Sequence, residues 1–210
     1  MFDLHCHILP GVDDGARDMR ESLAMLAEAK RSGINHIVCT PHCKSSSFNY
    51  DMICARYDEL RPQAERQGIR LDLGFEVHWQ KLMELGLDCA PDLCFEGTNL
   101  MLLEFSVGKM PANWQRIIYE LQGQGIQVII AHPERYQPIQ HNIDIAYELK
   151  ELGCLLQLSG NFISAGRLKA SRKTAINLLK EGLVDYVASD AHCAEDYADY
   201  REAMSEARMY

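Results

Sequence analysis

The 210 residues of the chain are 47% hydrophobic and carry a formal net charge of −9. This length and composition predict a single globular domain over residues 1–210 with a sizeable core. The negative charge, without any Lys- and Arg-rich run, excludes nucleic acid as the main partner, and no apolar run is long enough to predict a segment embedded in a membrane.

The start of the chain and its cysteines predict a cytoplasmic protein. Acidic Asp3 and two histidines stand where a secretion signal would have a basic segment. The eight cysteines are scattered and form no C-x-x-C pair, so we expect reduced thiols rather than disulfides or a zinc ribbon. None is followed six residues later by Arg, the spacing by which cysteine phosphatases hold phosphate.

The first predicted strand, residues 2–7, carries two histidines on one face. His5 and His7 are two residues apart, so on an extended backbone their side chains point to the same side, whereas Phe2 and Leu4 point into apolar packing. Two neutral imidazoles placed in this way can bind one divalent metal. Alone, the H-x-H pattern is weak, because two histidines on a half-exposed strand would look the same.

A turn-rich loop follows at residues 9–15, and in it Asp13 and Asp14 are either turn residues or metal ligands. After the loop, predicted helices and strands alternate to the end of the chain. The predicted strands cover 34–40, 69–77, 100–103, 126–131, 154–158 and 184–188, and the predicted helices cover 18–32, 51–67, 113–122, 144–152, 168–181 and 195–208. Residues 45–50 are predicted to form a polar loop, and 79–96 an irregular segment.

Seven strand-then-helix units predict an α/β fold with a parallel sheet. The fully apolar run 100–103 is typical of a strand buried on both faces. Because no strand reads as a polar edge, the pattern favours a barrel over the alternative, a doubly wound sheet. In either fold, sites lie at the C-terminal ends of the strands.

Metal-type side chains follow these strand ends. They are His5, His7, His42, Glu76, Glu104, His132, Asp190 and His192. His36 lies inside a strand instead, and we predict that it is a packed histidine. So many nitrogen and oxygen ligands exceed the needs of one ion, and a shared carboxylate can bridge two, so two or three divalent ions are expected, with manganese, iron and zinc all suited to the ligand types. Paired ions about 3.5–4 Å apart can hydrolyse a phosphoester without a covalent nucleophile.

Longer motifs make the chain similar to a known family. They are Asp3-Leu4-His5-Cys6-His7-Ile8-Leu9-Pro10-Gly11-Val12-Asp13-Asp14-Gly15, Thr40-Pro41-His42, Gly74-Phe75-Glu76-Val77, His132-Pro133-Glu134-Arg135-Tyr136 and Ser189-Asp190-Ala191-His192. With these blocks the sequence resembles the PHP (polymerase and histidinol phosphatase) superfamily. Within it, the sequence resembles the bacterial tyrosine-protein phosphatases of capsule and exopolysaccharide loci, the CpsB/YwqE type.

The resemblance implies a distorted (β/α)7, TIM-like barrel, the PHP fold, with a site for three ions that are often manganese. The implied ligand sets are His5, His7, Glu76 and Asp190 for one ion, the bridging Glu76 with Glu104 and His132 for a second, and Asp14, chosen over Asp13, with His42 and His192 for a third. The residues that it marks as catalytic are Arg135, Glu76 and His192, and Arg135 would bind the phosphoryl group. The implied partner is the phosphotyrosine tail of a bacterial tyrosine kinase that controls polysaccharide export.

Two departures from the family and two alternative functions stay open at this point. Cys6 and Cys193 stand where the family often has Ser and Asn, and the chain stops at Tyr210, where family members usually continue, so a variant shortened at the C-terminus is one expectation. The first alternative is a small-molecule phosphomonoesterase similar to histidinol phosphatase. The second is a metal-binding regulator of the kinase without catalysis. The native metal and the oligomeric state are likewise open, and an oligomer is compatible with the sequence.

Overall fold

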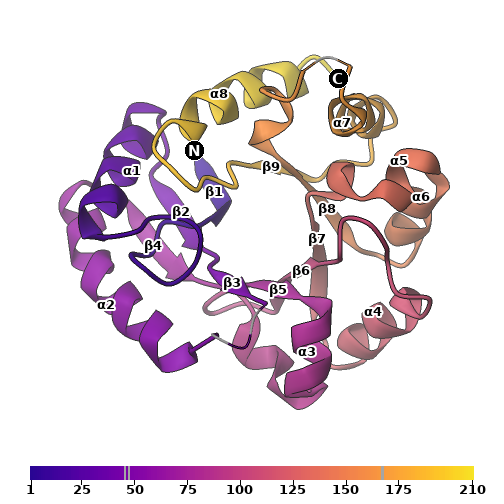
Figure 1. Ribbon diagram of the computed structural model, residues 1–210, viewed down its shortest axis with the longest axis horizontal. Helices are drawn as coiled ribbons and strands as arrows, with labels where there is room; N and C mark the ends of the chain where they lie inside the picture. The colour runs from indigo at the N-terminus through magenta and orange to yellow at the C-terminus, as the bar shows by residue number, and fades with distance from the viewer. Residues whose placement is uncertain (45, 47, 167) are drawn as a thin grey trace.

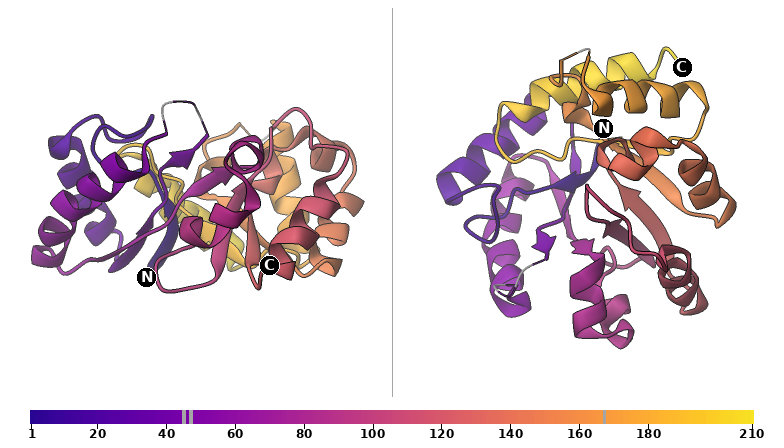
Figure 2. Two further views of the ribbon diagram at one scale, coloured as in Figure 1. Left: turned by 90° about the horizontal axis from the view of Figure 1, so that it is seen from below. Right: turned by 45° about the vertical axis from the view of Figure 1, so that its right-hand side comes forward.

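A computed structural model of the chain describes residues 1–44, 46, 48–166 and 168–210, and it shows a ring of parallel strands with helices packed around the outside (Figure 1). Side and tilted views show the same ring with both termini at its surface (Figure 2). The strands are β1 (Phe2–Cys6), β2 (His36–Cys39), β3 (His42–Cys43), β4 (Arg70–Leu73), β5 (Glu76–His78), β6 (Leu100–Glu104), β7 (Gln127–Ala131), β8 (Leu155–Ser159) and β9 (Tyr186–Ala188).

The helices alternate with the strands along the chain. The α-helices are α1 (Met19–Arg31), α2 (Tyr50–Arg66), α3 (Trp79–Leu85), α4 (Trp114–Gly123), α5 (Gln137–His141), α6 (Asp144–Glu151), α7 (Ala170–Lys180) and α8 (Asp196–Ala207), and the 3-10 helices are η1 (Leu87–Leu93), η2 (Pro133–Arg135) and η3 (Gly160–Phe162). In the part of the chain that the structure describes, no helix is long and apolar enough to cross a bilayer.

The strands form two parallel sheets, ordered β1-β2-β4 and β3-β5-β6-β7-β8-β9. The strand predicted over 69–77 is broken at Gly74 into β4 and β5, and the strand predicted to end at residue 40 resumes after Pro41 as β3. The hydrogen bonds Gly74 N to Cys39 O (2.8 Å) and Glu76 N to Pro41 O (3.2 Å) continue the pairing across both breaks. The seven strand positions therefore follow one another around the sheet in chain order, without the reversal that defines a doubly wound fold.

Backbone hydrogen bonds join the end of the β9 segment to β1. Asp190 N donates to His5 O (2.8 Å), and His7 N donates to Ala191 O (2.9 Å). Below them, the buried carboxylate of Asp3 accepts hydrogen bonds from the backbone N (2.8 Å) and the hydroxyl (2.6 Å) of Ser189. The predicted distorted (β/α)7 barrel is confirmed, and the doubly wound alternative is wrong.

The core has two layers because alternate residues of each strand face opposite sides. A small inner cluster fills the barrel, and it consists of Leu4, Val38, Phe95, Leu102, Ile129, Ala131 and Ala188. A larger cluster lies between the strands and the helices, and its members come from all along the chain, the first being Cys6 and the last Ala203. At Gly74, a Cβ atom would lie 2.4 Å from the Phe95 ring, so the inner packing requires glycine there. The inner cluster occupies the interior of the barrel, and the C-terminal ends of the strands are left for polar groups.

Several sequence predictions of local structure need correction. The segment 79–96, expected to be irregular, contains α3 and η1, and α5 was not predicted at all. Both α-helices have at most seven residues, too few for the helical spacing of apolar residues to stand out. The helix predicted from 168 begins at Ala170. The polar loop predicted over 45–50 includes residues 45 and 47, which lie outside the described residues.

Candidate metal centre

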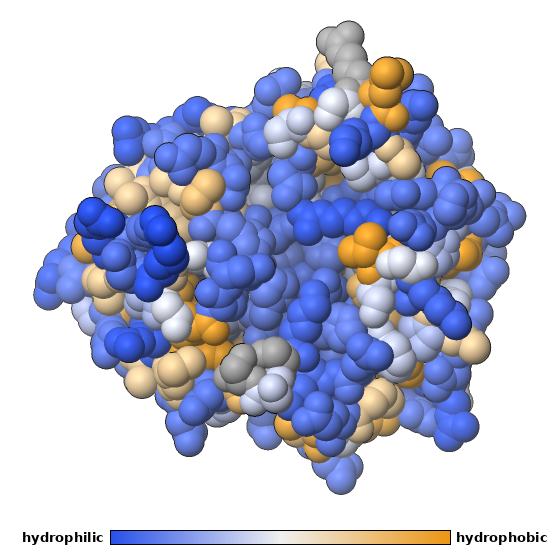
Figure 3. Space-filling view, in the orientation of Figure 1, coloured by the Kyte–Doolittle hydropathy of each residue, from blue (hydrophilic) through white to orange (hydrophobic). Residues whose placement is uncertain are grey.

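The C-terminal ends of the strands surround a hydrophilic hollow near the middle of the face shown in Figure 3. The nine side chains proposed as ligands from the sequence all belong to these strand ends or to the loops that follow them, and each contacts at least one other member of the set. They are His5, His7, Asp14, His42, Glu76, Glu104, His132, Asp190 and His192. His36 lies apart from them, with its Nε2 atom 2.6 Å from Asp72 Oδ2.

Glu76 is the centre of the cluster, because its buried carboxylate contacts four imidazoles. Its Oε2 atom lies 3.4 Å from Nε2 of both His5 and His7 and 2.8 Å from Nδ1 of His42. Its Oε1 atom lies 2.7 Å from Nε2 of His132. Burial opposes the charge on Glu76, but the charge on His5, the hydrogen bond with His132 and the close contact with His42 outweigh it, so the pKa of Glu76 falls well below its usual value.

Asp190 faces two ways at the end of β9. Its Oδ1 atom lies 3.3 Å from Nε2 of His5 and 3.4 Å from Nε2 of His7. Its Oδ2 atom accepts hydrogen bonds from Arg135 and from the hydroxyl of Ser159 (3.0 Å). Asp190 and His132 are also the two non-glycine residues with positive φ in the described part of the chain, at 51° and 34°. Such strained conformations are common at functional sites.

Hydrogen bonds at Nδ1 hold two of the imidazoles so that Nε2 points into the mouth of the barrel, which is the end formed by the C-terminal ends of the strands. Nδ1 of His5 lies 2.9 Å from Oε1 of Gln157, and Nδ1 of His7 lies 2.8 Å from Oδ2 of Asp13. Metal-binding histidines are oriented in this way by partners at the other ring nitrogen. Burial opposes the charge on Asp13, but its hydrogen bonds with His7, Gly15 and His42 outweigh burial and lower its pKa to about 2.

The loop after β1 passes very close to His7 and places two adjacent aspartates differently. At Gly15, a Cβ atom would lie 2.0 Å from His7 O, so only glycine allows this approach. The Asp13 side chain is 4% exposed and sits behind His7, whereas the Asp14 side chain is 69% exposed. The structure therefore places Asp14, the residue preferred in the sequence analysis, at the mouth.

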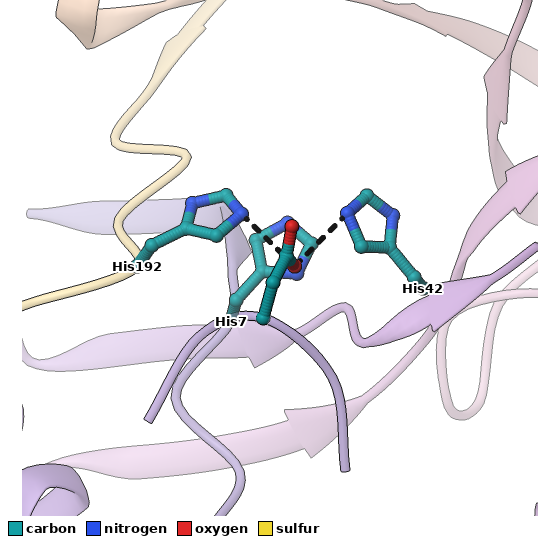
Figure 4. A group of neighbouring side chains, drawn as sticks. His7, His42 and His192 are labelled. Carbon is teal, nitrogen blue, oxygen red and sulfur yellow. Dashed lines mark ion pairs between the residues drawn. The ribbon is translucent and has the colours of Figure 1, made fainter. Parts of the chain in front are cut away.

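His42 and His192 come from distant strands, and their rings lie on either side of His7 (Figure 4). Asp14 lies close to both of them. Its Oδ1 atom is 3.3 Å from Nε2 of His42 and 3.4 Å from Nε2 of His192. The ring of His192 stacks on the ring of His7, with 4.1 Å between centroids. Burial and the nearby charge of His7 both lower the pKa of His192, which favours the neutral form that binds metals.

Two cations border the cluster. Arg135, at the end of η2, donates hydrogen bonds from Nη2 to the Ser159 hydroxyl oxygen (2.9 Å) and to the Asp190 carboxylate. Its side chain is 29% exposed. This position beside the candidate ligands is the one predicted for it. Lys44 was not predicted. Its Nζ atom lies 3.1 Å from each carboxylate oxygen of Glu104.

The sequence held signals for some supporting residues that we did not use. Lys44 follows His42 by two residues at a strand end, the same spacing that made us select His5 and His7. Gln157 is a polar residue within the apolar strand β8, and it is fully buried. A buried amide needs a hydrogen-bond partner, so its position could have marked it as a support for the site.

Three groups of candidate ligands have donor atoms that all lie within 4.8 Å of one another. The groups are His7, Asp14, His42 and His192; His5, His7 and Asp190; and His42, Glu76 and Glu104. They differ from the implied ligand sets in three ways. His7 joins the group of Asp14, Glu76 is absent from the group of His5 and Asp190, and His42 takes the place of His132 beside Glu104. His132 Nε2 lies 4.0 Å from Glu104 Oε1. Within the described residues, Oε2 of Glu76 is buried without a hydrogen-bond partner among three imidazole nitrogens. A divalent cation bound by nitrogen and oxygen ligands fits this arrangement.

Two cavities adjoin Asp14 on the surface of the cluster. The larger, about 480 Å³, is lined by residues of the first loop and α1, among them Arg17 and Glu21, and by the segment 192–195 after β9. The smaller, about 180 Å³, is lined by Val12, Asp13, Asp14, His42, Lys44, Phe48 and Ile53. Both are lined in part by candidate ligands, the larger by Asp14 and His192 and the smaller by Asp14 and His42.

A parallel barrel whose C-terminal mouth gathers histidines and carboxylates belongs to the class of (β/α) barrels that carry clustered metal-type side chains. Within that class, the chain belongs to the CpsB/CapC family of capsular polysaccharide synthesis, and the sequence profile of that family matches residues 1–208. The family resemblance seen in the sequence is thereby confirmed.

Named relatives match nearly the whole chain. Tyrosine-protein phosphatase YwqE of Bacillus subtilis (strain 168) is 33% identical over 196 residues, which are 91% of this chain and 77% of the relative. Tyrosine-protein phosphatase CpsB of Streptococcus agalactiae is 32% identical over 206 residues, 91% of this chain and 83% of the relative. A crystal structure from the work on YwqE of Bacillus subtilis and CpsB of Streptococcus pneumoniae, described as metal-dependent tyrosine phosphatases, matches with a TM-score of 0.86 and 28% identity over 98% of this chain and 87% of that chain.

Proposed function

We propose that the chain is a metal-dependent tyrosine-protein phosphatase that acts in capsular or exopolysaccharide synthesis. The proposal draws on the CpsB/CapC family and on relatives that bear the name tyrosine-protein phosphatase. The observation that carries it is the buried Glu76 carboxylate, which has imidazoles of four histidines around it and an oxygen without a hydrogen-bond partner in the described part of the chain.

The nine side chains at the mouth are the proposed ligands of two or three divalent ions, with manganese as the proposed metal and iron or zinc as alternatives. They are His5, His7, Asp14, His42, Glu76, Glu104, His132, Asp190 and His192. Bound ions of this kind supply an activated water and stabilise the attacking and leaving oxygens of a phosphoester. Glu76 and His192 serve the reaction by holding the ions, whereas Arg135 holds the phosphoryl group.

Arg135 suits the phosphoryl role because it reaches the cluster without being a metal ligand. Its Nη2 atom donates hydrogen bonds to Asp190 and Ser159, and the Nε and Nη1 atoms of the planar guanidinium can bind a ligand. A guanidinium can form two parallel hydrogen bonds with phosphate oxygens, which a lysine ammonium does not. The charge that develops on the equatorial oxygens during phosphoryl transfer strengthens these bonds.

The proposed substrate is phosphotyrosine in the tail of a bacterial tyrosine kinase that controls polysaccharide export. We also propose that residues 1–210 act as one domain, since one apolar cluster runs from Cys6 to Ala203. A cytoplasmic location is proposed as well, and eight free thiols suit a reducing compartment.

A turnover assay on the purified protein tests this function. A phosphotyrosyl peptide and histidinol phosphate are compared, each with and without added Mn²⁺. We expect Mn²⁺-dependent release of phosphate from the peptide and much slower release from histidinol phosphate. A preference for histidinol phosphate would favour a small-molecule phosphatase, and no turnover of either by protein with bound metal would favour a regulator without catalysis.

A further inference from the structure

Lys44 occupies an unusual position, because its ammonium neutralises a carboxylate that a metal ion would also neutralise. Its Nζ atom lies 3.1 Å from both carboxylate oxygens of Glu104. The Glu104 side chain is nearly buried, and it shares a candidate ion-binding group with His42 and Glu76. A divalent ion at this group and the Lys44 ammonium therefore compete for the same negative charge.

The local structure lets Lys44 move. The residue directly follows β3, and its side chain is 46% exposed, whereas that of Glu104 is 6% exposed. Lys44 lines the cavity of about 180 Å³ beside Asp14 and His42, so its flexible stem has open space next to it. A lysine ammonium on a four-carbon stem changes partner without any backbone movement.

The electrostatics give the direction of that movement. An ion at Glu104 places two positive charges near the present position of the ammonium, and like charges at this range repel each other. The cavity that Lys44 lines is bordered by Asp14 and His42, which are both proposed ligands. An anion held by ions at these residues thus lies beside the displaced ammonium, and a phosphoryl oxygen is the anion that the proposed function brings there.

We propose that Lys44 competes with a divalent ion for Glu104 and, once displaced, contacts a phosphate oxygen of the bound substrate. The proposal rests on the phosphatase function and adds to it a second cation besides Arg135. The two cations start from different carboxylates, Lys44 from Glu104 and Arg135 from Asp190. Lys44 thereby links metal binding at Glu104 to the affinity of the site for phosphate.

Metal affinity provides the first test. Ion-free wild-type protein and the Lys44→Met variant, which keeps an unbranched side chain one atom shorter and without charge, are titrated with Mn²⁺ by calorimetry. We expect binding in Lys44→Met to be tighter by roughly threefold to tenfold, because a competing positive charge is gone. Unchanged or weaker binding would mean that Lys44 only holds Glu104 in place, and it would overturn the proposal.

Phosphate affinity provides the second test, in Mn²⁺-loaded protein. Orthophosphate binding is measured directly and as inhibition of p-nitrophenyl phosphate hydrolysis. We expect affinity to fall about tenfold in Lys44→Met, as for the loss of one charge-assisted hydrogen bond, and to recover in part in Lys44→Arg. Equal orthophosphate affinity in wild type and Lys44→Met would overturn the proposal.

A matched control separates these effects from a general loss of charge. Lys30, in the last turn of α1 just before β2 begins, lies at the opposite end of the strands, and its ammonium contacts Gln67 O. Lys30→Met should leave both affinities unchanged, and equal shifts in that variant would refute a local role for Lys44. Since both tests use Mn²⁺ and orthophosphate, they hold even if phosphotyrosine proves not to be the substrate.

Discussion

Replacing Arg135 with alanine removes the guanidinium that we assign to the phosphoryl group. In the structure, the hydrogen bonds found for this guanidinium within the described residues leave from Nη2, toward Asp190 and Ser159. Nε and Nη1 are thus the atoms that can bind a phosphoryl group. The side chain is 29% exposed, so water screens such bonds less than at an open surface.

The expected loss follows from those two nitrogens. Two charge-assisted hydrogen bonds of about 1.5 kcal/mol each amount to about 3 kcal/mol, or roughly a hundredfold in kcat/KM. Arg135→Lys should recover only part of this loss, because an ammonium cannot form the paired bonds. Bound metal should stay at the wild-type level at neutral pH, because the Oδ1 atom of Asp190 that faces His5 and His7 is not the one that Arg135 contacts.

Steady-state kinetics with a phosphotyrosyl peptide, together with metal analysis of the same samples, measures this effect. Arg17→Ala is the matched control, because Arg17 borders the larger cavity but is 82% exposed and paired with Glu21. Ser159→Ala is a second control that removes the other partner of Asp190 Oδ2 and should lower activity less. If Arg135→Ala keeps its metal and turns over peptide within about threefold of wild type, or if Arg17→Ala shows the larger loss, Arg135 is not the clamp.

Three further outcomes test the metal centre. A chelator should abolish turnover, whereas thiol alkylation should mostly spare it. The variant Cys193→Ser, which removes the exposed thiol beside His192, should stay active. Rapid inactivation by alkylation in protein that keeps its metals would contradict a thiol-independent reaction. Glu76→Gln should lower bound metal by more than one equivalent, whereas Glu104→Gln should lose at most one, and full metal content in Glu76→Gln would place the bridge elsewhere. Burial opposes protonation of His5 and His7, but the neighbouring carboxylates outweigh it and raise both pKa values above 6.5. The protonated rings therefore stabilise the folded ion-free protein below pH 6.5. This stability is lost as the pH rises through the raised pKa values. Denaturant unfolding of ion-free protein should therefore show falling stability from neutral to alkaline pH, with Mn²⁺ preventing the fall, and a flat or rising profile would refute the reasoning.

The barrel was predictable because its signal is repeated seven times along the chain. In six of the seven units a predicted helix follows the predicted strand, and this periodicity survives errors in any one element. The breaks at Pro41 and Gly74 were harder to predict. A proline removes a ladder hydrogen bond, and Gly74 is needed because the ring of Phe95, which comes from a segment read as irregular, occupies the space of its Cβ atom.

The ligands were predictable for a different reason from the residues that orient them. Parallel strands bring their C-terminal ends to one edge, so His, Asp and Glu at those ends meet whatever the register. The contact between His5 and Gln157 joins residues 152 positions apart and depends on the register of β8 around the ring. Asp13 and Asp14 are adjacent in sequence, and the fold of the loop, in which Asp13 is held behind His7 by a hydrogen bond, leaves Asp14 as the one that faces the mouth.

The partners of the buried carboxylates bear on how the protein behaves without metal. Glu104 is paired with Lys44, Asp190 with Arg135, and Glu76 lies among imidazoles whose protons can balance it. Metal binding is then an exchange of partners, in which ions displace protons and an ammonium, rather than the filling of an uncompensated negative site. For this reason we expect chelation to stop turnover at neutral pH without unfolding the barrel, and the fold to depend on the ions only where the imidazoles have lost their protons.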